Sequence, residues 1–134
     1  MSTKTITDKL LIKPNTTYWT ATDEEATLLG PLPEGVRRAE SLGEATVGLI
    51  FVADAATARQ TLDAQRAALT GPDVLWVAYP KGNRSDINRD SLWPIVAEYG
   101  MRPCGQVAID ERWSALRFRA NRPGEAPFNP GARR

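Results

Sequence analysis

Two apolar segments separated by an amphipathic helix place the strongest constraint on how this chain can fold. Residues 46–53 and 73–79 are apolar on both faces, as strands covered by helices on each side are. Asp54 follows the first of them in the position of a helix N-cap. The apolar residues of the intervening helix share one face: Ala55, Ala58, Leu62 and Leu69. Two buried strands joined by a helix form a parallel βαβ unit, so we expect an α/β fold.

The N-terminal third adds two strands and a short helix to this unit. Residues 16–22 and 36–41 have the β-branched and aromatic composition of strands. Thr22 and Glu25 have the spacing of a capping box, and Gly30 is a natural helix stop. The sequence therefore predicts strand, short helix and strand ahead of the central unit.

The C-terminal half predicts a helix followed by a hairpin. Proline is tolerated only in the first turn of a helix, so Pro94 indicates a helix that begins after a cap at Asp90 or Ser91. Residues 105–110 and 114–119 alternate between apolar and polar side chains, which is typical of an antiparallel pair.

This order of elements resembles the later half of a Rossmann-type sheet, above all the methyltransferase version, which closes with an antiparallel hairpin. We therefore expect a small, truncated Rossmann-like mixed sheet with flanking helices. The 134 residues suit one domain. We predict an N-terminal arm over residues 1–15, a single α/β domain over 16–119 and a flexible basic tail over 120–134.

The composition excludes several classes of chemistry. The absence of histidine removes Ser-His-Asp and Cys-His nucleophile pairs and imidazole metal ligands. Cys104 is the only cysteine, so no intrachain disulfide can form, and we expect its side chain to be at least half-buried. The net charge of +1 is unlike that of a basic nucleic-acid coat. We expect a cytoplasmic protein without a nucleic-acid partner or membrane contact, since no apolar stretch is long enough for a membrane span.

The segment after the first predicted strand disfavours a conventional cofactor. Dinucleotide and methyltransferase sites place glycines there, so that the backbone can approach the cofactor. Residues 22–27 contain no glycine and three carboxylates, which repel phosphate. The sequence therefore predicts no bound cofactor and no metal.

A polar loop after the second central strand is the first candidate site. It would lie at the carboxyl edge of the sheet, where α/β proteins place their ligands. Its cationic and hydrogen-bonding side chains could hold a small anion or a protein partner: Lys81, Arg84, Ser85, Asp86, Arg89 and Asp90. The alternative is an ordinary loop in which Asp86 and Asp90 pair with the arginines.

The predicted hairpin is a second candidate, because its turn could meet that loop at the same end of the sheet. The residues concerned are Asp110, Glu111, Trp113 and Arg117. Asp110 and Glu111 are neighbours on a strand end, so their side chains should point to opposite faces. Trp113 is better explained by a lid over the core than by a stacking role at a binding site.

Three runs of sequence resemble a bacterial family catalogued as domain of unknown function 3052. They are Leu-Trp-Val-Ala-Tyr-Pro-Lys over 75–81, Ser-Asp-Ile-Asn-Arg-Asp over 85–90 and Val-Ala-Ile-Asp-Glu-Arg-Trp-Ser-Ala-Leu-Arg-Phe-Arg over 107–119. The resemblance covers residues 45–119 well and the first 40 weakly. It supports the α/β fold and implies no particular activity.

The missing catalytic chemistry and the cationic loop together favour a non-enzymatic binding or regulatory module, with no catalytic residue assigned. The alternative is a degenerate methyltransferase-like or small hydrolytic enzyme that uses Asp86, Asp90 and Asp110. A third hypothesis is a subunit that oligomerises through exposed aromatic side chains: Tyr18, Trp19 or Trp93.

Overall fold

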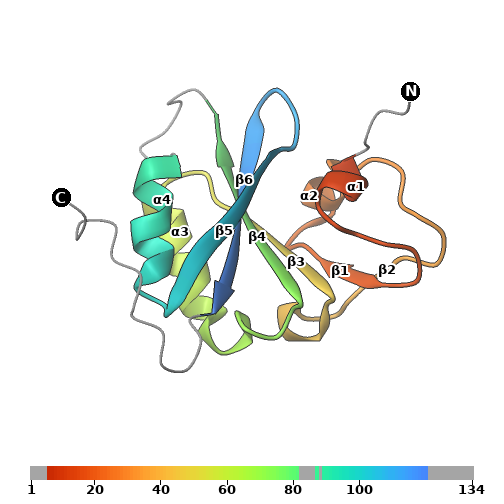
Figure 1. Ribbon diagram of the computed structural model, residues 1–134, viewed down its shortest axis with the longest axis horizontal. Coiled ribbons are helices and arrows are strands. Elements are labelled where there is room, and N and C mark those ends of the chain that lie inside the picture. The colour runs from red at the N-terminus through yellow and green to blue at the C-terminus, as the bar shows by residue number, and fades with distance from the viewer. Residues whose placement is uncertain (1–5, 82–86, 88, 121–134) are drawn as a thin grey trace.

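The computed structural model describes residues 6–81, 87 and 89–120, with the side chains of residues 89 and 90 left out. These ranges form a six-stranded sheet with helices on both faces (Figure 1). The strands are β1 (Thr17–Trp19), β2 (Arg37–Arg38), β3 (Val47–Phe51), β4 (Val74–Pro80), β5 (Met101–Ala108) and β6 (Trp113–Ala120). The helices are α1 (Ile6–Lys9), α2 (Asp23–Thr27), α3 (Ala55–Ala64) and α4 (Arg89–Ala97), with the short 3₁₀ turns η1 (Leu42–Glu44) and η2 (Arg66–Ala68).

The strand order is β2-β1-β3-β4-β6-β5. Strands β2, β1, β3 and β4 are parallel, whereas β6 runs antiparallel to both β4 and β5. The predicted mixed α/β sheet with a closing hairpin is therefore confirmed. The strands β1 and β2 are short, so this half of the sheet is small. The connection from β2 to β3 consists of η1 and its flanking loops.

The central strand β3 is buried along its whole length, as its apolar sequence predicts. Gly48 lies where η1 closes against the sheet. A Cβ atom at this position would collide with Cδ1 of Leu42 and lie 3.1 Å from Cγ of Pro72. A larger residue at 48 would force the buried Leu42 side chain to move, so glycine allows the close packing seen here.

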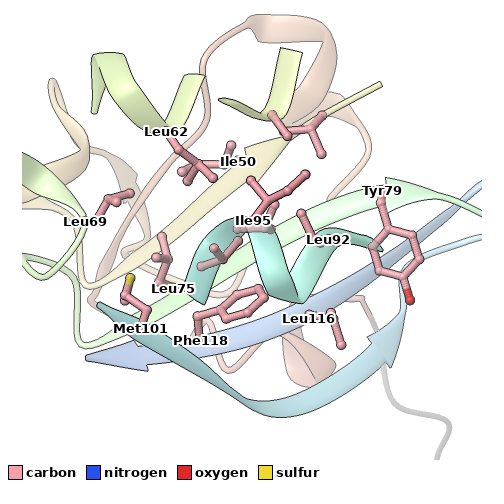
Figure 2. Packing of buried hydrophobic residues seen from close by; sticks show 14 of the residues in the cluster. Ile50, Leu62, Leu69, Leu75, Tyr79, Leu92, Ile95, Met101, Leu116 and Phe118 are labelled. Atoms are coloured by element: carbon pink, nitrogen blue, oxygen red, sulfur yellow. The ribbon is translucent and has the colours of Figure 1, made fainter. Parts of the chain in front are cut away.

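Helices α3 and α4 cover one face of the sheet and bury the larger part of the core. Figure 2 shows this cluster, in which Leu62 of α3 and Ile95 of α4 pack over β3 and β4. The predicted core residues Leu92, Ile95 and Val96 are all buried. The alternation in β6 is confirmed as well, because Leu116 and Phe118 point into this cluster.

The opposite face is covered by α1, α2 and the segment that joins α1 to β1. Leu10 and Ile12 are buried there, and the indole nitrogen of Trp76 donates to the carbonyl of Leu10 at 2.9 Å. Residues 6–12 thus pack on the sheet through the buried Thr7, Leu10 and Ile12, in contrast to the arm expected from the sequence. The weak alternation of this segment did not indicate which face of the sheet would bury its apolar residues.

The predicted N-caps of α2 and α3 are present, whereas the cap expected at Asp90 or Ser91 is not, because α4 already begins at Arg89. The Asp54 carboxylate accepts from the amide of Thr57 at 2.7 Å, and this bond holds the Asp54 pKa below its ordinary value. Gly30 and Gly100 follow α2 and α4 with φ of 70° and 79°. Glycine adopts this conformation at little cost, which explains why the helices end there.

Several local expectations were wrong. Helix α4 begins at Arg89, so Pro94 lies inside the helix and not in its first turn. The burial of the apolar face of α4 offsets the hydrogen bond that a proline cannot donate. Cys104 is exposed because it lies at a bulge of the edge strand β5. Tyr18 is buried, so it presents no oligomerisation surface.

No helix in the ranges that the structure describes is both long and apolar enough to cross a bilayer. The predicted tail falls almost wholly on residues 121–134, which lie outside those ranges.

Candidate functional site

The carboxyl ends of β1 and β3 form the topological switch point of this sheet. The chain leaves β1 through α2 to reach β2 on one side, whereas β3 lies on the other side and continues through α3 to β4. Helices α2 and α3 cover opposite faces of the sheet, as Figure 1 shows. Open α/β sheets bind ligands where the connections diverge in this way.

The loop after β1 is held by a capping box. The Thr22 hydroxyl accepts from the amide of Glu25 at 3.1 Å, and the Glu25 carboxylate accepts from the amide of Ala21 at 3.2 Å. Burial raises the pKa of Glu25 above its ordinary value, against the lowering effect of the Ala21 amide and of Arg38. The loop therefore presents fixed carboxylates at the carboxyl edge.

Arg38 of β2 connects the edge strand to this loop. Its guanidinium donates to the carbonyl of Thr20 at 2.9 Å and pairs with the Asp23 carboxylate. The buried hydroxyl of Thr20 donates to the carbonyl of Thr22 at 3.0 Å. These bonds organise the loop without the glycines that a conventional cofactor loop would use.

The β5–β6 hairpin reaches the same edge. The Asp110 carboxylate accepts from the amides of Arg112 and Trp113, both at 2.8 Å, and so shapes the turn. The amide of Lys81 donates to the carbonyl of Arg112 at 2.8 Å. The structure thus brings the end of β4 and the hairpin turn together, as the sequence suggested.

A hollow of about 420 Å³ lies between α2 and the hairpin. We call it the switch-point hollow, and its lining residues are Thr22, Glu24, Glu25, Leu28, Arg112 and Trp113. It combines two carboxylates with one guanidinium, an apolar side chain and a half-buried indole. A hollow of about 460 Å³ along β1 and the edge strand β2 has no aromatic lining residue. The switch-point hollow is therefore the better candidate for a ligand with a planar ring.

The sequence-predicted site residues are only partly brought together. Lys81 is half-buried beside the hairpin. Arg84, Ser85 and Asp86 lie outside the described residues, as do the side chains of Arg89 and Asp90. The anion loop over residues 81–90 therefore stays a prediction.

The hairpin candidates divide between the two ends of the sheet. Trp113 lines the switch-point hollow, whereas Glu111 is exposed and the Asp110 carboxylate is engaged by two turn amides. Arg117 lies far along β6, opposite Trp76 of β4. Arg117 therefore does not join the carboxyl-edge site, because about four residues of extended chain separate it from the turn.

Three residues that line the hollow were not predicted as site residues: Glu24, Leu28 and Arg112. The acidic run after the first strand predicts repulsion of phosphate, and the same carboxylates suit a cationic ligand. Nothing in the sequence indicated that Arg112 would face Glu24 across a hollow, since that proximity depends on the strand order.

The comparisons with known proteins bear on the fold. No family model and no curated protein matches the chain, so the resemblance to domain of unknown function 3052 stays a prediction. Among solved structures, the chain is similar to Sp1610 of Streptococcus pneumoniae, assigned as a tRNA (m1A22) methyltransferase. The identity is 12% and the TM-score 0.55, over 91% of this chain and 69% of that one.

Two further structures share the fold. A protein of the NADB-Rossmann superfamily from Streptococcus agalactiae matches with 8% identity and a TM-score of 0.54, over 90% of this chain and 69% of that one. A variant of LepI, solved with SAH and a substrate analogue, matches with 11% identity and a TM-score of 0.51, over 87% of this chain and 39% of LepI. These likenesses establish a Rossmann-like fold of the methyltransferase type.

They also correct the leading interpretation of the sequence. A non-enzymatic binding or regulatory module was expected, but the solved structures that share this fold include an assigned methyltransferase and a protein bound to SAH. The methyltransferase-like alternative is the better supported of the two. The expectation of a non-enzymatic module rested on the missing glycines; in the structure, bonds from Thr22, Glu25 and Arg38 hold the loop after β1 without them.

Proposed function

We propose that this protein is a methyltransferase-like enzyme that binds S-adenosylmethionine in the switch-point hollow. The observation that carries the proposal is the chemistry of the hollow, which places Glu24 and Glu25 opposite Trp113 at the switch point. A ligand with a cationic centre and a planar base suits carboxylates and an indole better than a ligand with phosphates does.

The charge of the ligand distinguishes this proposal from a dinucleotide site. S-adenosylmethionine has a sulfonium and an ammonium group against one carboxylate, so it is a net cation without phosphate. Glu24 and Glu25 would attract the cationic part, and Arg112 would pair with the carboxylate of the ligand. When bound, S-adenosylmethionine supplies a methyl group on an electrophilic sulfonium.

The loop after β1 limits how closely S-adenosylmethionine can approach the backbone. Ala21 and Thr22 have side chains at positions where glycines would allow a close approach. We therefore place the ligand over the hollow, between α2 and the hairpin, and not against the loop backbone. This arrangement makes Trp113 and Leu28 the apolar contacts of the site.

Isothermal titration calorimetry with S-adenosylmethionine, S-adenosylhomocysteine and ATP tests the proposal. We expect S-adenosylmethionine to bind most tightly, S-adenosylhomocysteine less tightly because it lacks the sulfonium charge, and ATP not at all. At 100 times its Kd, the ligand should raise the free energy of unfolding by about 2.7 kcal/mol. Binding of ATP alone, or of none of the three, would overturn the proposal.

A further inference from the structure

Arg117 has no counter-ion in the part of the chain that the structure describes. Its Nε atom is buried and has no hydrogen-bond partner, although the residue as a whole is half-buried. By contrast, Arg38, Arg59 and Arg66 each pair with a carboxylate. A partly desolvated guanidinium without an acceptor is unfavourable, so this position favours a partner that the described residues do not supply.

A cavity of about 340 Å³ lies beside Arg117 at the amino ends of β3 and β4. We call it the amino-edge cavity, and its lining residues are Leu11, Lys13, Thr16, Thr46, Asp73, Val74 and Arg117. It lies at the opposite end of the strands from the switch-point hollow. Lys13 and Arg117 are its two cations, and Asp73 is its one carboxylate.

The backbone that carries Lys13 is fixed on the sheet beside Arg117. The bond from Trp76 to the carbonyl of Leu10 fixes this segment on the sheet next to Arg117, because Trp76 and Arg117 are register partners. Lys13 follows three residues later, and the Thr16 hydroxyl donates to its carbonyl at 2.6 Å. The cavity is thus formed by packing of distant segments and not by a single surface loop.

Asp73 lines the same cavity without pairing directly with either cation. In the described ranges it forms no ion pair with Lys13 or with Arg117, and its side chain is exposed. The Thr46 hydroxyl lies 3.4 Å from that of Thr17, in hydrogen-bond contact. The free donors of the cavity are therefore the ammonium and the guanidinium.

We propose that the amino-edge cavity binds the phosphate group of a small phosphorylated molecule. A guanidinium offers parallel N–H groups that match two oxygens of a phosphate, and an ammonium adds a second positive charge. Leu11 and Val74 form an apolar wall that suits the carbon skeleton of a phosphate ester. This site is separate from the proposed S-adenosylmethionine site and goes beyond the proposed function.

Calorimetric titration with inorganic phosphate and with glycerol 3-phosphate tests the proposal, at constant ionic strength maintained with chloride. We expect both to bind, with the ester tighter because of the apolar wall. Arg117→Met and Lys13→Met should each weaken binding about tenfold or more, since each removes a charge-assisted hydrogen bond. The matched control is Arg37→Met, at an exposed arginine of β2.

The outcomes separate a binding residue from a structural one. Phosphate binding that is unchanged in Arg117→Met and Lys13→Met, or lost equally in Arg37→Met, would overturn the proposal. No binding of either probe to the unmodified protein would do the same. If Arg117→Met fails to fold, the proposal is tested with Lys13→Met alone, because Lys13 is exposed and its replacement should not affect folding. Saturation with S-adenosylmethionine should leave phosphate affinity unchanged, because the two sites lie at opposite ends of the strands.

Discussion

The rings of Phe51 and Trp113 meet edge to face, with centroids 5.1 Å apart and planes at 84°. Phe51 ends β3 and Trp113 begins β6, so the pair spans β4. The rings can meet because the intervening register partners of Phe51 are small, first Ala78 on β4 and then Ala115 on β6. This contact fixes the hairpin over the carboxyl ends of the parallel strands and gives the switch-point hollow its aromatic wall.

Replacing Trp113 tests both roles of this contact. We expect Trp113→Ala to lower the free energy of unfolding by about 2 kcal/mol, through lost burial and the lost ring contact. It should also abolish S-adenosylmethionine binding. Trp113→Phe keeps an aromatic ring and should retain most of both. Urea unfolding and calorimetry measure the two effects, and full ligand affinity in a folded Trp113→Ala protein would exclude the indole from the site.

Glu24 should affect affinity for S-adenosylmethionine more than affinity for S-adenosylhomocysteine. We expect Glu24→Gln to weaken S-adenosylmethionine binding roughly fivefold, or about 1 kcal/mol, because one carboxylate at a partly exposed site is lost. The affinity for S-adenosylhomocysteine should change less. Glu34→Gln, at an exposed carboxylate outside the lining residues, is the control. Equal losses for both ligands would contradict an electrostatic role.

A side chain at Gly48 should be destabilising. We expect Gly48→Ala to cost about 1–3 kcal/mol, because the added methyl group would force the Leu42 side chain to move and would press on the Pro72 ring. Gly43→Ala is the matched control, since its Cβ would meet Ala68 at an ordinary distance of 3.5 Å. Chemical denaturation of both variants measures the difference. Equal stabilities would show that η1 can shift at little cost.

The buried hydrogen bond of Trp76 should be costly to remove. Trp76→Phe leaves the Leu10 carbonyl buried without its donor, and we expect a loss of about 2 kcal/mol. Trp19→Phe, at a half-buried indole packed against the α3 and α4 cluster, should cost less. Hydrogen exchange of residues 6–12 would report whether the segment loosens; unchanged protection would show that the bond does not hold it.

Two carboxyl groups should give pH dependences of opposite sign. Burial raises the pKa of Glu25 above 4.5, so its contribution to stability is full below that pH and is lost as the pH rises through the raised pKa. Glu25→Gln keeps the capping-box geometry without a titrating group, so it should be more stable than the unmodified protein at about pH 7 but not at about pH 3.

Asp54 provides the contrast to Glu25. The Thr57 amide lowers the Asp54 pKa below 3.8, so the stability contributed by Asp54 is present above that pH and is lost as the pH falls through the lowered pKa. Asp54→Asn retains a capping side chain and should flatten the acid limb of the stability curve. Thermal denaturation from about pH 3 to about pH 7 measures both variants, and slopes of the same sign would contradict the two assignments.

Local patterns in the sequence were sufficient for most of the elements. The caps at Thr22 and Asp54 depend on residues three positions apart, so they can be predicted without knowledge of the fold. The burial of β3 and β4 follows from their continuous apolar runs. The start of α4 was mispredicted, because the preference of Pro94 for the first turn is overridden by the packing of the helix's apolar face.

The sequence by itself thus determined the α/β order, the caps, the buried central strands and the closing hairpin, because each depends on residue type and short-range spacing. Only the tertiary structure decided that Trp113 and Arg112 meet Glu24 across a hollow, and that Arg117 lies with Lys13 at the other end of the sheet. Those contacts join segments 88 to 104 residues apart. Their proximity is set by strand order and register, which no local pattern encodes.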